Sequence, residues 1–138
     1  GIPMFETGTQ MNLTLSYEIL GMSGGTTRRP NTVSSVSYPG SVNEWFSPSS
    51  FANPAALQFG TAGRNSVAGP GRDNWNLSLF KAFQFSERAR FELRFETYNT
   101  FNHTQFNGVN TTYGNGGFGA VNSTFDPRTL QLGAKFQF

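Results

Sequence analysis

The sequence has no cysteine and few charged residues, and both facts narrow the functions that the chain can have. Without cysteine it forms no disulfide and no thiolate metal site. The formal net charge is only +2 over 138 residues, and Arg28 and Arg29 are the notable basic pair outside the expected strands. Such a charge distribution attracts phosphates weakly. The sequence therefore predicts no nucleic-acid partner.

Long apolar runs are also missing. No stretch approaches the roughly 20 apolar residues of a membrane-spanning helix, and residues 1–20 lack the basic start and continuous apolar stretch of a signal peptide. The chain begins with Gly1 and not with Met, so we expect it to be processed or cut from a longer protein. It is instead rich in aromatic and small polar residues, with 15 Phe and 16 Gly. This composition is typical of β structure with short turns.

Four segments alternate apolar and polar residues with the period of two that marks a β-strand with one apolar side. We expect strands near residues 9–20, 74–85, 88–101 and 129–138. Only Ser86-Glu87 separates the second segment from the third. These two strands should therefore form an antiparallel hairpin with a tight turn, and their apolar residues should share one face.

Two long polar stretches, residues 21–72 and 102–127, separate the other strands. They are rich in Gly, Pro and Asn, which interrupt regular elements, and we expect them to be long loops. A compact soluble domain rarely holds a loop of about fifty residues. Either the first stretch contains short strands around Val33–Val36 and Ala56–Phe59, or it is a large surface loop.

An apolar face opposite a polar face is compatible with two environments. In a soluble sandwich the apolar face is the core, whereas in a membrane barrel it meets lipid and the charges line a wet lumen. The expected strands favour the barrel, because soluble strands cluster near five or six residues and membrane strands need about 9–11. The connections also alternate long, tight, long, as they do in barrels with short periplasmic turns and long outer loops.

Aromatic residues near the strand ends are a third feature that favours a barrel. They resemble the girdles at the two water interfaces of a membrane barrel, with Trp75 and Tyr98 at one end and Phe83, Phe85, Phe136 and Phe138 at the other. The alternative is the ordinary preference of aromatic residues for strands. We predict an all-β fold, an antiparallel sheet of long strands with long Gly/Asn/Pro-rich loops that forms part of a β-barrel in the lipid of the bacterial outer membrane.

The last eight residues resemble the C-terminal signal of outer-membrane barrel proteins. The pattern is the polar Gln131, then Gly133, and then two aromatic residues, Phe136 and Phe138. This resemblance implies that the barrel-assembly machinery is a partner of the chain and binds these residues, as an edge strand added to a sheet.

A wider resemblance covers the chain from Val42 onward. It is carried by an ordered set of motifs: Asn43-Glu-Trp-Phe, Gly63-Arg-Asn, Gly69-Pro-Gly, Asn74-Trp-Asn-Leu-Ser-Leu-Phe-Lys, Glu87-Arg-Ala-Arg-Phe, Phe101-Asn-His and Asp126-Pro-Arg. In this order they resemble the C-terminal region of TonB-dependent receptors with an N-terminal carboxypeptidase-regulatory-like domain, the Oar-like type. The resemblance implies a barrel of about twenty-two strands with a plug, energised transport and an inner-membrane partner complex.

Four strands cannot close such a barrel. We therefore expect a fragment that does not transport alone and that pairs with the remainder of the barrel or with other copies of the chain, because open sheet edges pair with other chains.

Residues suited to catalysis or metal binding are sparse. His103 is the only histidine. No Gly-x-Ser-x-Gly elbow accompanies it, and a histidine metal site would lack its second imidazole. Glu92 and Glu96 share a face with Arg90 and Arg94, which favours salt bridges over a paired-carboxylate glycosidase site. We expect no catalytic residue, no cofactor and no metal.

The leading hypothesis is thus a non-enzymatic C-terminal part of a TonB-dependent transport barrel of the outer membrane. One alternative is a small soluble or self-assembling β-module with a binding role. Another is a small hydrolase that uses His103.

Overall fold

The computed structural model describes residues 1–16 and 28–138, and these residues are almost entirely β-strand and loop. They divide into two compact units. The first contains Gly1–Glu6, Arg72–Gln105 and Phe125–Phe138, and the second contains the described part of Thr7–Gly71 together with Phe106–Thr124. The helical structure in the described ranges is the short 3-10 turn η1 at Pro48–Ser50. No helix within those ranges is long and apolar enough to cross a membrane.

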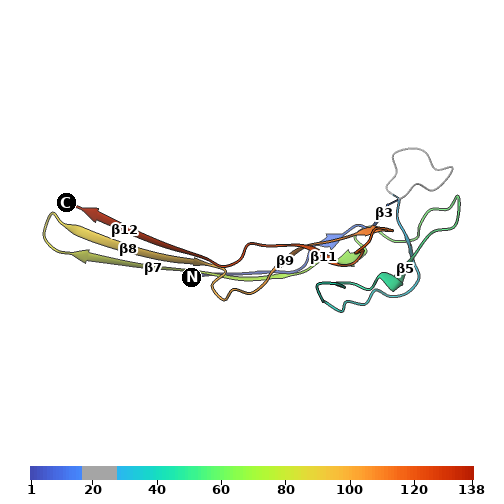
Figure 1. The fold of residues 1–138 in the computed structure, drawn as a ribbon, viewed down its shortest axis with the longest axis horizontal. Helices are drawn as coiled ribbons and strands as arrows, with labels where there is room; N and C mark the ends of the chain where they lie inside the picture. The colour runs from blue at the N-terminus through green and yellow to red at the C-terminus, as the bar shows by residue number, and fades with distance from the viewer. Residues whose placement is uncertain (17–27) are drawn as a thin grey trace. The chain divides into compact units, whose positions relative to one another are not determined.

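The first unit is one antiparallel sheet with the strand order β1-β7-β8-β12. Its strands are β1 (Ile2–Glu6), β7 (Arg72–Gln84), β8 (Arg90–Tyr98) and β12 (Thr129–Gln137). Figure 1 shows β7, β8 and β12 as long neighbours, with the C-terminus at the same end as the β7–β8 loop. The sheet is open, with β1 and β12 at its edges. The predicted fold class, an antiparallel sheet of long strands in part of a barrel, is confirmed.

Strand β1 was not predicted, because its Pro3 weakens the strand pattern. Proline donates no backbone hydrogen bond, so it is confined to edge strands and bulges. β1 is such an edge strand, and it pairs with the first part of β7 from Ile2 opposite Asn76 to Glu6 opposite Arg72. Beyond Asn76, no strand of the described chain pairs with this edge of β7.

The loop between β7 and β8 spans residues 85–89 and is longer than predicted. Phe85 N–H donates to the Ala89 carbonyl at 2.9 Å, and the Ser86 hydroxyl accepts from Ala89 N–H at 3.1 Å. The antiparallel hairpin predicted near Ser86-Glu87 is therefore present, but its turn is longer than the two residues that separate the predicted strands.

The length of this loop decides which side chains share a face. A two-residue turn would have placed Phe83 opposite Arg90, because side chains alternate with a period of two. The observed loop instead places Phe83 opposite Phe91 and Leu79 opposite Phe95. An odd number of loop residues thus brings the apolar residues of both strands to one face, as predicted from their alternation.

The second unit is held together by an aromatic core and contains only short strand pairs. The pairs are β2 (Gln10–Met11) with β6 (Val67–Ala68), β3 (Thr14–Leu15) with β10 (Thr112–Tyr113), β4 (Asn31–Thr32) with β5 (Phe51–Ala52), and β9 (Phe106–Val109) with β11 (Val121–Thr124). The β3–β10 pair is parallel. The rings of Phe46, Phe51 and Phe118 meet edge to face at centroid distances of 5.2 to 5.9 Å. Leu13 and Val67 are completely buried beside them.

This unit corrects the predictions for the two long loops. Residues 28–72 and 102–127 contain β4, β5, β6, β9, β10 and β11, and the short strands do not lie at Val33–Val36 or Ala56–Phe59. The single strand predicted at residues 9–20 also differs, because its described part forms two separate pairings around the buried Leu13. Residues 17–20 of that prediction lie outside the described residues. Phe118 contacts Phe46 and Phe51 across a long sequence separation, so no local periodicity indicates this core.

Candidate functional site

The three long strands of the first unit present one apolar face. Residues in register form rows across the strands, which are Phe83–Phe91–Phe136, Lys81–Leu93–Ala134, Leu79–Phe95–Leu132 and Leu77–Thr97–Leu130. Leu79 is 68% exposed and Leu132 is 75% exposed. All described strands of this unit belong to the same sheet, so the unit has no second layer of its own to cover the face. A contiguous exposed apolar surface of this kind marks contact with a partner or a membrane.

The opposite face of the same strands carries ion pairs. Arg90 and Glu92 lie 2.8 Å apart, and Arg94 and Glu96 lie 3.4 Å apart. Lys135 on β12 lies in register with Glu92. Each pair links neighbours along one strand face, so the charges are largely balanced. The face is polar and suited to water.

A hollow of 570 Å³ lies beside these ion pairs, and Gly133 is among the residues that line it. Across from Gly133, the Arg94 guanidinium lies 4.7 Å from the centroid of the Phe80 ring. This is the geometry of a cation–π contact.

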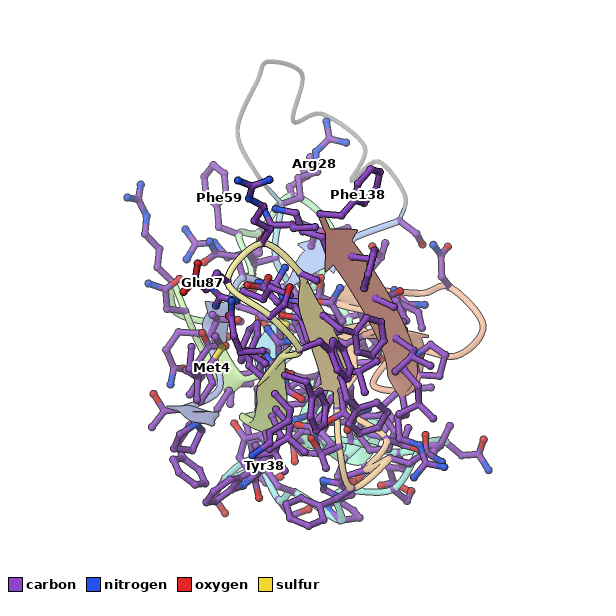
Figure 2. All side chains as sticks on the ribbon, turned by 90° about the vertical axis from the view of Figure 1, so that its left-hand side faces the viewer. Met4, Arg28, Tyr38, Phe59, Glu87 and Phe138 are labelled. Atoms are coloured by element: carbon purple, nitrogen blue, oxygen red, sulfur yellow. The ribbon has the colours of Figure 1, made fainter. Side chains whose placement is uncertain are left out.

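Aromatic rings gather on the apolar face beside the β7–β8 loop. Phe83 and Phe91 stack at 6.3 Å, and Phe136 lies 6.0 Å from Phe138. Lys81 Nζ lies 5.7 Å from the centroid of the Phe83 ring. The long Lys81 side chain thereby places its ammonium group toward the end of the sheet that carries the β7–β8 loop. Seen from that end, the labelled Glu87 and Phe138 both lie near the viewer (Figure 2).

Comparison with known protein families identifies the family of this chain. The family model described as an outer membrane beta barrel domain matches residues 1–131. The chain belongs to this family. No curated protein and no solved structure shows a significant match to this chain. Membership indicates a membrane location, and it agrees with a one-layer sheet that is apolar on one side and ion-paired on the other.

Four residues of the barrel domain were predicted to form its assembly signal, and all lie on or just beyond β12. Gln131 is in register with Glu96 and Gly133 with Arg94 on the polar face, whereas Phe136 is in register with Phe91 on the apolar face. Phe138 is 96% exposed. The outer edge of β12 pairs with no strand of the described chain. Recognition of these residues by the barrel-assembly machinery stays a prediction.

Trp75 and Tyr98, predicted to share one girdle, lie on opposite faces of the barrel domain's sheet. Trp75 lies on the apolar side, with Phe5 and Phe101 in edge-to-face contact at 5.9 Å each. Tyr98 lies on the polar side and lines a hollow of 300 Å³ together with Arg72. A role at the membrane interface stays a prediction for Trp75 and Tyr98, and equally for Phe83 and Phe85.

His103 belongs to a polar network at the end of β8. Its Nδ1 lies 2.6 Å from Gln105 Nε2, and Gln105 Oε1 in turn accepts from Asp73 N–H at 2.7 Å. Within residues 1–16 and 28–138, no serine hydroxyl or carboxylate hydrogen-bonds to the His103 ring, and no group of three metal-ligating side chains occurs. The ring therefore positions Gln105 in this network.

Asn99 is the centre of this network, and the sequence patterns did not single it out. It adopts a left-handed backbone with φ of 51°. Its Nδ2 donates to the His103 carbonyl at 3.1 Å and to the Asp126 carbonyl at 3.4 Å, while its Oδ1 accepts from His103 N–H at 3.1 Å. Asn tolerates this backbone and bonds to nearby main chain. An Asn directly after a long alternating strand is the signal that could have revealed it.

Replacing Asn99 with Leu should lower the free energy of unfolding by about 2–4 kcal/mol, because each buried polar group left unpaired costs about 1–3 kcal/mol. The left-handed backbone adds roughly 1–2 kcal/mol for a residue other than Gly or Asn. Asn99→Gly removes the same hydrogen bonds without the backbone strain, so its loss should be smaller. Urea unfolding of the chain in detergent micelles measures both. Equal losses for Leu and Gly would show that the backbone conformation does not contribute.

Proposed function

We propose that the chain is a non-enzymatic C-terminal part of the wall of a TonB-dependent transport barrel in the bacterial outer membrane. The observation that carries this proposal is the one-layer sheet of β7, β8 and β12, which is apolar on one face and ion-paired on the other. In a membrane barrel the apolar face meets lipid and the polar face lines the lumen. Family membership supports the barrel.

The assignment to the TonB-dependent type rests on the ordered motifs of the sequence. Two of these motifs form identifiable elements of the first unit. The Asn74 motif forms most of β7, and Phe101-Asn-His forms the turn that follows Asn99. The open edges of β7 and β12 require other strands, so the partners are the remainder of the barrel, its lipid and the machinery that assembles it.

Co-purification with the inner-membrane TonB protein tests this type of transport. The full-length barrel that contains this segment should recover TonB from crosslinked cells. Residues 1–138 alone should recover none, since the TonB-contacting segment of the resembled family lies N-terminal to the barrel. A full-length barrel that inserts in the outer membrane but recovers no TonB would contradict energised transport and leave the barrel fold intact.

A self-assembling β-module is the second candidate, and the unpaired edges favour it. The edge of β7 beyond Asn76 and the outer edge of β12 carry backbone groups that another copy can bind. In buffer without detergent, such a module should remain soluble as defined oligomers, whereas a barrel segment should precipitate. Light scattering separates the two outcomes.

A further inference from the structure

One corner of the first unit combines aromatic side chains with a carboxylate around a hollow, an arrangement that a barrel wall does not require. At the end of the sheet away from the β7–β8 loop, a hollow of 550 Å³ is lined by Asp73, Trp75, Asn99, Phe101, Asn102 and His103. Two of these residues are aromatic and one is a carboxylate. Convergent polar groups beside aromatic walls are typical of small-molecule sites.

The aromatic walls of the corner stand nearly at right angles. The Trp75 and Phe101 rings have centroids 5.9 Å apart and an interplanar angle of 75°. Phe101 is 69% exposed although it is a large apolar side chain. The faces of such rings carry the negative part of the ring quadrupole, which attracts cations.

The backbone holds the Phe101 wall against Trp75. Phe101 sits at the tip of a turn in which Asn102 N–H donates to the Asn99 carbonyl at 2.8 Å. Thr100 bonds the turn to the neighbouring strand, because its N–H and its hydroxyl both donate to the Trp75 carbonyl, at 2.9 and 2.8 Å. The two rings are thus placed before any ligand arrives, which lowers the entropic cost of binding.

Asp73 supplies the charge of the corner. It lies two residues before Trp75 on β7, so both side chains fall on the same face of the strand. Its backbone is anchored through the Gln105 amide. Within the described ranges, the sheet's ion pairs involve Glu92 and Glu96, and Asp73 has no cationic partner. The corner therefore combines an unpaired carboxylate with two aromatic faces.

We propose that the corner of Asp73, Trp75 and Phe101 binds an organic ammonium cation. A cation of this class can pair with the carboxylate while it contacts the aromatic side chains that line the same hollow, whereas a neutral apolar ligand can contact only the rings. An anion would be repelled by Asp73. The proposal depends on the fold of the first unit and not on TonB-dependent transport, so either can fail alone.

Choline and its neutral isostere 3,3-dimethylbutan-1-ol test the proposal on the full chain in a non-ionic detergent. The indole N–H signal of Trp75 in NMR spectra is the readout, and that of Trp45, which lies in the second unit, is the internal control. Choline should shift the Trp75 signal saturably in the millimolar range, with at least about tenfold weaker binding of the alcohol. Equal binding of the two compounds, or no binding of choline, would overturn the proposal.

Two variants locate the interaction. Asp73→Asn keeps the shape of the side chain and should weaken choline binding by at least about fivefold, and Phe101→Leu should do the same by removing one aromatic wall. Glu87→Gln, in the β7–β8 loop at the other end of the sheet, is the matched carboxylate control and should bind normally. An Asp73→Asn chain that retains the wild-type spectrum and full affinity would contradict the assigned site.

Discussion

Leu132→Arg should reduce insertion of the chain into lipid vesicles by a factor of about 30 to 1,000, because a lipid-facing arginine near the bilayer midplane costs about 2–4 kcal/mol. Leu132 is in register with Phe95, which is in turn in register with Leu79, in a middle row of the apolar face. Its side chain is among the most exposed on that face. The fraction protected from protease after mixing with vesicles measures insertion.

Gln131→Arg is the matched control for this experiment. Gln131 precedes Leu132 on β12 but lies on the polar face, in register with Glu96. An arginine there meets a carboxylate and water, so insertion should change by less than about twofold, since lumen-facing positions tolerate charge. Equal effects of the two substitutions would contradict the assignment of the apolar face to lipid and would favour the self-assembling module.

Deleting Glu87 alone should be more damaging than deleting Glu87 and Arg88 together. The loop of residues 85–89 has an odd number of residues, which places Phe83 opposite Phe91. Removing one residue shifts the register by one and moves the apolar residues of one strand to the polar face of the other. Removing two leaves a three-residue loop, a common hairpin connection that preserves the parity.

Vesicle insertion and far-UV circular dichroism measure this effect. The single deletion should reduce insertion by at least about tenfold, since it disrupts a whole face of the sheet. The chain with the double deletion should retain most of the wild-type insertion, although it lacks one residue more than the chain with the single deletion. If the single deletion inserts as well as the double deletion, a bulge absorbs the missing residue and loop parity does not govern the face.

The strands that local pattern predicted best are those with regular alternation. β8 has charged residues at its even positions from Arg90 to Glu96 and apolar residues at its odd positions from Phe91 to Phe95. β12 has apolar residues at its even positions from Leu130 to Phe136, and its odd positions carry polar residues or Gly133. Each strand therefore shows its two faces without reference to the rest of the chain. The pattern is also why the ion pairs of Arg90 and Arg94 with their neighbouring glutamates were expected before the structure showed them.

The cation corner illustrates what local pattern misses. Asp73 and Trp75 belong to the start of β7, whereas Phe101 follows the end of β8. The left-handed turn at Asn99 and the bonds from Thr100 to the Trp75 carbonyl bring them together. From the sequence alone, Phe101-Asn-His could be identified only as a family motif. The position of this turn depends on its hydrogen bonds to the Trp75 carbonyl, which lies about 25 residues earlier in the chain.

The sequence by itself determined the all-β class, the long amphipathic strands and the resemblance to outer-membrane barrels. These properties follow from side-chain alternation, which is local to each strand. The tertiary structure decided the loop parity of the hairpin, the edge strand β1 with its Pro3, and the folding of the predicted loops around Phe46, Phe51 and Phe118. The pairing of β1 and the aromatic core depend on contacts between residues distant in sequence, and such contacts leave no periodic signature along the chain. The loop parity depends on how the backbone closes between Phe85 and Ala89, which side-chain alternation does not specify.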